Sequence, residues 1–388
     1  LGGILTEALG DVVFAAAPLS RREARAMIRR LAASHLITQS FRGEPAADEE
    51  ALVDLLVGLG RLGAERPEVA SVDLNPVILC GARPVAVDAL VEIVEAPAEP
   101  RAAAKPPGDE EILERFRPLF DPRGIVVAGV SSHPGKFGFT AYHNLLRFGY
   151  RGELFPVNRD GVEILGRATL RDVSEVPEGR ADLVFVCTPN QVNIELLRAC
   201  AQRGVRAAFI ASGGYGEAGA EGKVREKELV DVANQLGMLV AGPNGQGVIS
   251  TGCSMCAQIV APNPPPGHVA VVSQSGNLVS SFLNYAVLSG VGVSKAISSG
   301  NSAQTGLADY IEYFGADPET QVALAYLEGV PDGARFIEAV RAVTARKPLV
   351  LVKGGVASEG KRAAASHTGA MASDDRVFYG ISRQLGAI

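Results

Sequence analysis

The chain has 388 residues, enough for roughly two to four domains that each have an apolar core. Hydrophobic residues make up 47% of the chain and charged residues 21%, a composition that excludes disorder or a fibrous structure for most of it. The formal net charge is −6, from 37 basic and 43 acidic residues, so we expect no partner among nucleic acids or anionic membranes.

The cysteine content and the first residues bear on the cellular compartment. Five cysteines are scattered through apolar segments, unlike the dense pairing of a disulfide-stabilised secreted domain, so we expect a cytoplasmic protein. Cys253 and Cys256 have CxxC spacing, but no second pair completes a zinc site, and a metal or redox role is disfavoured. No apolar run reaches the roughly 20 residues of a membrane span. The chain starts without Met, in what reads as the middle of a strand, which predicts a fragment.

Residues 1–97 predict a small α+β unit. Ser20 and Glu23 have the spacing of a capping box, which predicts a helix over 20–32. A second helix and two strands are expected over 48–62, 69–74 and 85–91. The unit is too small to be a complete nucleotide-binding domain. Prolines between 95 and 108 block helix and strand pairing, and we place a linker at 98–115.

Beyond the linker, short β-rich segments alternate with helical patterns. Strands are expected at 124–130, 152–157, 183–187, 207–210, 238–241, 269–272, 294–297, 322–326 and 349–353, and helices at 140–148, 191–203, 223–236, 277–289, up to 314, and 334–344. This alternation predicts an α/β protein with parallel sheets covered on both faces. A break at 262–267 divides the pattern, so we expect two doubly wound domains, 116–255 and 256–388.

Three polar turns follow strands of the first predicted sheet. Ligands of such sheets bind beyond the carboxyl ends of the strands. The first turn, 131–138, contains Lys136, which could hold a phosphate, and the next two contain Asn158-Arg159 and Thr188-Pro189. The spacing GxGxxG is absent, and the P-loop order is absent because Phe137 follows Lys136. The three turns favour a nucleotide-like ligand over ordinary loops.

The second predicted sheet has a candidate anion site at residues 273–277. The sequence Ser273-Gln274-Ser275-Gly276-Asn277 joins a strand to the start of a helix, where backbone N–H groups and the helix dipole favour an anion. The alternative is an ordinary N-cap formed by Ser275 or Asn277. A similar turn occurs at 298–302.

His367 is the candidate nucleophile. It is one of five histidines and lies among small residues in Ser366-His367-Thr368-Gly369-Ala370, which leaves its ring accessible. A neutral imidazole is a competent nucleophile near pH 7. Glu328 follows the strand at 322–327 and could stabilise the ring's cation. The alternatives are a surface or packing histidine and an ordinary surface glutamate.

These residues resemble a known family. Gly2-Gly3 with Glu7, residues 11–18, 41–45, Asp73-Leu74-Asn75-Pro76 and 87–89 resemble the closing third to half of an ATP-grasp domain. Residues from Pro122 onward resemble the Rossmann-like CoA-binding domain and flavodoxin-like ligase domain of NDP-forming (ADP-forming) acyl-CoA synthetases, relatives of succinyl-CoA synthetase. The most specific motifs are 366–370, the Gly242-Pro243-Asn244-Gly245 turn, and Asn75 with Asp88. The resemblance covers nearly the whole chain except the linker.

The resemblance implies a role for each candidate residue. It implies that His367 is a phosphohistidine, that Glu328 stabilises it, and that residues 273–277 cradle the phosphoryl group. It further implies that Mg²⁺ binds Asn75 and Asp88 beside the phosphates of ATP or ADP. The residues implied to hold CoA are Gly129, Ser131, Gly135, Lys136, Asn158, Arg159, Thr188, Pro189 and Asn244. Arg159 replaces the Lys of many relatives, and Gly245 replaces the Cys of succinyl-CoA synthetase, which argues against that enzyme.

The function implied is synthesis of an acyl-CoA from a small carboxylic acid, CoA and ATP, with ADP and phosphate released. The expected partners are the missing front of the ATP-grasp domain, the missing small domain after the ligase domain, and further copies of the chain in a homo-oligomer. The alternative is a CoA-sensing regulatory module of a protein acetyltransferase-like protein, which retention of His367 and Glu328 disfavours. A nicotinamide-dependent dehydrogenase is the third possibility, disfavoured by the missing dinucleotide motif. The sequence does not identify the acid.

Overall fold

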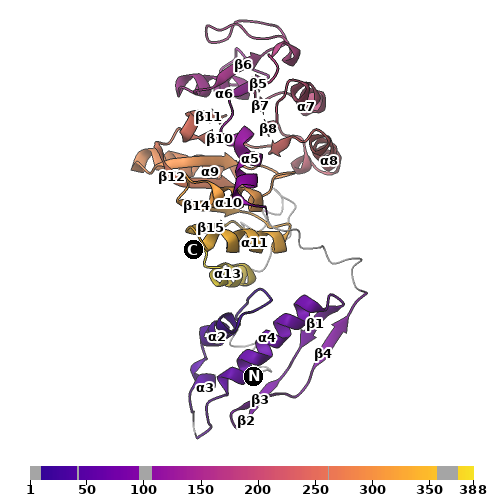
Figure 1. The fold of residues 1–388 in the computed structure, drawn as a ribbon, viewed down its shortest axis with the longest axis vertical. Coiled ribbons are helices and arrows are strands. Elements are labelled where there is room, and N and C mark those ends of the chain that lie inside the picture. The colour runs from indigo at the N-terminus through magenta and orange to yellow at the C-terminus, as the bar shows by residue number, and fades with distance from the viewer. Residues whose placement is uncertain (1–9, 42, 96–106, 261, 356–374) are drawn as a thin grey trace. The chain divides into compact units, whose positions relative to one another are not determined.

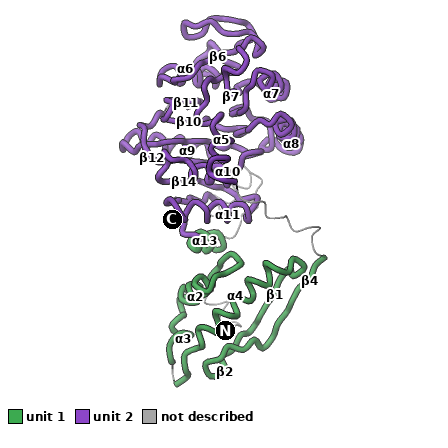
Figure 2. The backbone as a smooth tube through the Cα atoms, in the orientation of Figure 1, with its two compact units in different colours: residues 1–106, 373–384 green, residues 107–372, 385–388 purple. Residues whose placement is uncertain are grey.

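The computed structural model describes residues 10–41, 43–95, 107–260, 262–355 and 375–388. The chain forms two compact units, which Figure 2 colours separately: residues 1–106 with 373–384, and residues 107–372 with 385–388. None of the helices within the described residues is long and apolar enough to cross a membrane.

The first unit packs helices beside short antiparallel strands (Figure 1). The predicted capping box is confirmed at the start of α2 (Arg21–Arg30), where Ser20 and Glu23 each accept the other's backbone N–H. Ala24 and Ile28 of α2 pack against Val53 of the second predicted helix. The helices of this unit are α2, α3 (His35–Thr38), α4 (Glu49–Glu65) and α13 (Asp375–Gln384).

The strand predicted at 85–91 is two strands. β3 (Arg83–Ala86) pairs with β2 (Val77–Cys80), and β4 (Leu90–Ile93) pairs with β1 (Val69–Asp73). The chain changes partner between them, because the Val87 N–H donates to the Pro76 carbonyl and ends the first ladder. The apolar pattern continues across this change of partner, which is why the sequence indicates one strand.

The second unit begins with a helix inside the predicted linker. α5 (Asp109–Phe120) has three acidic residues in its first turn, which favours a helix N-terminus. Phe116 and Phe120 are buried, and their rings lie 5.0 and 4.6 Å from the ring of Tyr313. The non-helical connection therefore ends before Asp109, because burial of these rings stabilises α5.

The first sheet of this unit is parallel, as predicted, with the order β6-β5-β7-β8-β9. Because the chain crosses from β6 to the other side of β5, the loops after β5 and β7 flank a topological switch point, where ligands of such sheets bind. The strands are β5 (Gly124–Ala128), β6 (Glu153–Val157), β7 (Leu183–Val186), β8 (Ala207–Ile210) and β9 (Leu239–Ala241), and the helices are α6 (Phe137–Arg147), α7 (Asn193–Gln202) and α8 (Ala220–Gln235).

The second sheet has the order β11-β10-β13-β12-β14-β15, in which the last four strands are parallel. Its strands are β10 (Gly247–Ser250), β11 (Met255–Gln258), β12 (Pro266–Ser273), β13 (Val293–Ser298), β14 (Val322–Leu327) and β15 (Leu349–Lys353), with helices α9 (Gly276–Ser289), α10 (Leu307–Ala316) and α11 (Gly333–Thr344). The hairpin of β10 and β11 was not predicted, and it pairs with β13 of the second sheet. The CxxC cysteines lie in this hairpin, where burial raises the pKa of Cys256 to about 12 and also raises that of Cys253.

The close packing of α6 on the exit of β5 requires a glycine at position 138. A Cβ atom on Gly138 would lie 2.1 Å from the carbonyl oxygen of Gly129. We predict that Gly138→Ala destabilises the second unit by about 1–3 kcal/mol, because the backbone must move to admit the methyl group. The measurement is denaturant unfolding. Gly333→Ala is the matched control, since Gly333 is also in the first turn of a helix and has open space around it; equal stability of both variants would contradict the prediction.

Candidate active site

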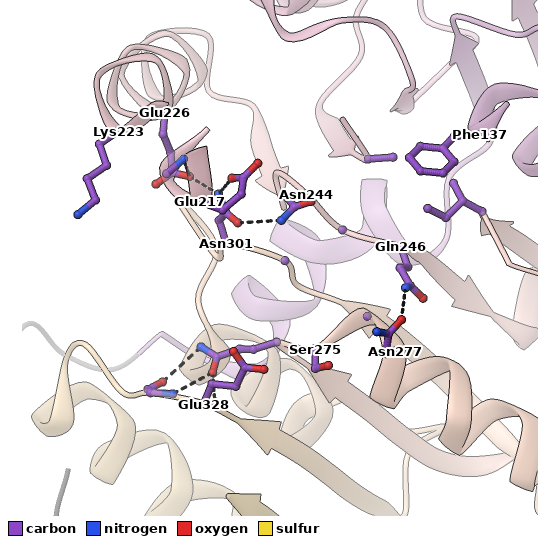
Figure 3. Close-up of a pocket in the computed structure, with 18 of the residues that line it drawn as sticks. Phe137, Glu217, Lys223, Glu226, Asn244, Gln246, Ser275, Asn277, Asn301 and Glu328 are labelled. Carbon is purple, nitrogen blue, oxygen red and sulfur yellow. Dashed lines mark hydrogen bonds between the residues drawn. The ribbon is translucent and has the colours of Figure 1, made fainter. Parts of the chain in front are cut away.

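A cavity of about 570 Å³ lies where loops of the two sheets of the second unit meet (Figure 3). Loops after β8, β9, β12, β13 and β14 line it, together with the start of α6. Four residues predicted for the phosphoryl site, Gln274, Ser275, Gly276 and Asn277, line the cavity, as do Glu328 and Asn244. The structure therefore brings these predicted residues to one place.

The turn at 273–277 leaves the N-terminus of α9 open to the cavity. Ser273 is only 1% exposed, and its hydroxyl accepts the Ser275 N–H at 3.1 Å and donates to the Ser275 carbonyl at 2.6 Å. Ser275 is the N-cap residue by position, but its side chain makes no capping hydrogen bond. The alternative of an N-cap at Ser275 is therefore confirmed in position, but without a side-chain hydrogen bond, and Asn277 lies inside the helix. The first N–H groups of this 14-residue helix are available for an anion in the cavity.

The Gln274 side chain joins this turn to the loop after β14. Its Oε1 accepts the backbone N–H groups of Glu328 at 2.6 Å and Gly329 at 3.2 Å, and its Nε2 donates to the Gly329 carbonyl at 3.3 Å. These bonds hold Glu328 beside the start of α9, where Figure 3 shows its carboxylate. His367, the predicted partner of Glu328, lies outside the described residues.

The opposite side of the cavity has a network that the sequence did not predict. The Asn244 amide donates to Asn301 Oδ1 at 3.4 Å, and Asn301 Nδ2 donates to Glu217 at 2.6 Å and to Glu226 at 2.7 Å. Burial alone would raise the pKa of the Glu217 carboxyl, but the hydrogen bonds from Asn301 and from backbone N–H groups outweigh it and lower the pKa. Glu217 is therefore a carboxylate at neutral pH. The glycine-rich segment 213–219 after a predicted strand is the signal that could have drawn attention to Glu217.

Eight of the nine residues predicted to hold CoA lie in the loops after β5, β6 and β7, around the switch point of the first sheet, whereas Asn244 follows β9 at the far edge of that sheet. The Asn158 amide donates to the Val130 carbonyl at 2.7 Å, and a Cβ on Gly129 would lie 3.1 Å from the Thr188 side chain. The β5–α6 loop holds itself in shape, since the Ser131 hydroxyl and the His133 ring accept the N–H groups of His133 and Gly135. Of the residues predicted to hold CoA, Gly135, Lys136, Arg159 and Pro189 are exposed at this edge.

The first unit places Asn75 and Asp88 in two segments joined by a backbone hydrogen bond. They flank the hydrogen bond from Val87 to Pro76, and both are exposed. No group of three or more His, Cys, Asp or Glu residues suited to a metal occurs among the described residues. An amide and a carboxylate nevertheless fit Mg²⁺, which binds through one or two protein oxygens and completes its shell with water and phosphate.

Three domain families match the chain: an ATP-grasp domain over residues 1–93, a CoA binding domain over 123–251, and a succinyl-CoA ligase like flavodoxin domain over 266–388. The alpha subunit of ADP-forming acetate–CoA ligase I from Pyrococcus furiosus is 38% identical over 274 residues, covering 70% of this chain and 59% of that protein. The chain is related to the ADP-forming acyl-CoA synthetases. This confirms the resemblance that the sequence motifs predicted.

Further relatives support this relationship. ADP-forming acetate–CoA ligase II from Archaeoglobus fulgidus is 29% identical over an alignment that includes all of this chain and 56% of the ligase. The solved dinucleotide-forming acetyl-coenzyme A synthetase 1 of Ca. Korarchaeum cryptofilum, in complex with phosphate and ADP, superposes with a TM-score of 0.66 at 33% identity, covering 70% of this chain and 59% of that one. The chain thus spans less than two thirds of the length of these relatives. Because they are named as ligases or synthetases, the alternative of a CoA-sensing module is not favoured.

The hydrogen bonds of Gln274 predict a measurable effect on the Glu328 loop. Gln274→Leu leaves the N–H groups of Glu328 and Gly329 without their acceptor, so we expect amide hydrogen exchange at these two residues to accelerate at least tenfold. The matched control is Gln304→Leu, since Gln304 also bonds to backbone but lies in another loop. Unchanged protection of Glu328 in Gln274→Leu would contradict the role given to this side chain.

Proposed function

We propose that the complete protein synthesises an acyl-CoA from a small carboxylic acid, CoA and ATP and releases ADP and phosphate. The observation that supports this most is the single cavity in which an uncapped helix N-terminus, at 275–277, lies beside Glu328 and next to the start of α6. An anion-binding helix end suits a phosphoryl group. The start of α6 follows the loop predicted to hold CoA, so the thiol of CoA would reach the cavity from that side.

The chemistry requires activation of the acid. A carboxylate is a poor electrophile, so its oxygen first attacks a phosphoryl group to give an acyl phosphate. The CoA thiol then attacks the acyl carbon, its proton is lost, and inorganic phosphate leaves. In this proposal His367 carries the phosphoryl group from ATP to the acid, which lets the nucleotide and the CoA occupy separate sites.

The predicted site residues have distinct parts in this scheme. The N–H groups at the start of α9 bind the phosphoryl oxygens, where the helix dipole also favours negative charge. Glu328 stabilises the cationic ring of the phosphorylated histidine, and Gln274 positions Glu328 through the backbone. Lys136, Arg159 and the polar side chains Ser131, Asn158 and Thr188 hold CoA, together with Gly129, Gly135, Pro189 and Asn244.

The nucleotide half of the reaction requires more than the first unit supplies. Asn75 and Asp88 would hold Mg²⁺, which would neutralise phosphate charge on the nucleotide. Val91 and Ile93 of β4 share one face of the strand and are 45% and 69% exposed, as expected of a face that a further layer covers in the complete ATP-grasp domain. The beta subunit of the P. furiosus ligase I matches 89 residues of this chain at 42% identity. We propose that the remaining ATP-grasp residues, and further copies of the chain, complete the enzyme.

The five cysteines fit a reducing compartment, since all are free. Burial raises the pKa of Cys187 and Cys200 to about 12, so these two thiols stay protonated and unreactive. We propose the cytoplasm as the location on this basis.

Phosphorylation of His367 tests the proposed function. In the complete enzyme, γ-labelled ATP should give an acid-labile, base-stable phosphoprotein, and His367→Ala should abolish both the label and acyl-CoA formation, because in this proposal His367 carries the phosphoryl group to the acid. Glu328→Gln should lower the amount of label, because a neutral amide stabilises the ring cation less well. Glu228→Gln, the same substitution at an exposed residue of α8 that does not line the cavity, should leave labelling intact. Normal synthetase activity in His367→Ala would overturn the relay and favour an adenylate route.

A further inference from the structure

The wall of the cavity opposite the α9 N-terminus is negatively charged. Among the described residues that line the cavity, the ionisable side chains are the carboxylates of Glu217, Glu226 and Glu328 and the ammonium group of Lys223. Figure 3 shows Glu217, Glu226 and Asn301 together on one side, away from Ser275 and Glu328. A cavity for an anionic acid therefore has one wall suited to an anion and one that repels it.

The hydrogen bonds fix this charge in place. Both carboxylates accept a bond from the Asn301 side-chain nitrogen, which uses both hydrogens of that amide. Asn301 therefore has no hydrogen left to donate to a substrate, and its oxygen already accepts from Asn244. Glu226 also accepts the Gly216 N–H, and Glu217 accepts the Gly214 N–H. No ion pair joins Lys223 to either carboxylate within the described part of the chain.

The orientation of the acid follows from the proposed function, on which this inference rests. The reacting carboxylate lies at the α9 N-terminus, where the phosphoryl group is held, and the thiol arrives from the α6 side. The remaining wall faces the distal end of the acid, and that wall is the one formed by Glu217, Asn301 and Glu226.

We propose that Glu217 and Glu226 determine substrate specificity by repelling a second negative charge, so that the enzyme accepts monocarboxylic acids and rejects dicarboxylic acids of the same length. A neutral or hydrogen-bond-donating distal end is compatible with this wall, because carboxylate oxygens are acceptors. A distal carboxylate is disfavoured by like-charge repulsion and by loss of its own hydration.

Three four-carbon acids test this in the complete enzyme: butanoate, 4-hydroxybutanoate and succinate, with ADP release and acyl-CoA formation as readouts. We expect kcat/KM for succinate to be at least tenfold below that for butanoate. In the Glu217→Gln/Glu226→Gln double variant, kcat/KM for succinate divided by kcat/KM for butanoate should rise about tenfold, chiefly because the KM for succinate falls. A ratio is the measured quantity because it is insensitive to a general loss of activity.

The matched control is Glu228→Gln, an exposed residue on α8 that does not line the cavity, and it should leave the ratio unchanged. Equal use of succinate and butanoate by the unaltered enzyme, or an unchanged ratio in the double variant, would overturn the specificity role and leave the proposed function standing. No turnover with any acid would contradict the proposed function itself, and the specificity role with it.

Discussion

The Gln274 side chain is the interaction on which the arrangement of the site depends. β12 and β14 are neighbouring parallel strands, with Ser273 opposite Tyr326, so their carboxyl ends emerge side by side. Sheet pairing brings the two loops together but does not fix their conformation. Gln274 fixes the loop after β14, because its side-chain oxygen accepts two backbone N–H groups of that loop. Gln274 itself belongs to the turn that leads into α9, whose N-terminus faces the cavity. One amide thereby relates the anion-binding helix end to Glu328.

The second constraint is the junction between the two sheets of the second unit. The loop after β13 donates backbone hydrogen bonds to the turn after β9, from Asn301 to Pro243 and from Ala303 to Gly242. From the other sheet edge, the buried Asn144 of α6 donates to the carbonyls of Gln258 and Val260. These contacts make one cavity out of loops that belong to two domains. A thiol bound on the first sheet can therefore meet an acyl phosphate bound on the second.

Much of the fold could be predicted because its signals are local. Residues close together in the sequence define the capping box at Ser20 and Glu23. The same is true of the alternation of buried strands with helices after residue 120. The β10–β11 hairpin could not be predicted, since its short strands are defined by pairing with β13, which is distant in sequence. α5 was not predicted, because the prolines before it indicated a non-helical linker. Burial of its aromatic side chains against Tyr313 stabilises the helix.

The candidate site divides in the same way. The turn at 273–277 and Glu328 could be found because each follows a strand, and the family resemblance gave them roles. Glu217, Glu226 and Asn301 come from three segments, and only the folded structure brings two carboxylates to one amide. A sequence reveals a residue at a strand end, but not a network whose members are joined across loops.

The most direct test of the acyl phosphate is to follow an oxygen atom. If the acid attacks a phosphoryl group, an ¹⁸O label in the carboxylate of the acid must appear in inorganic phosphate when acyl-CoA forms, because the bond between carbon and that oxygen breaks as the thiol attacks. The account predicts ¹⁸O in phosphate and none in nucleotide. Label in AMP, or in neither product, would contradict it.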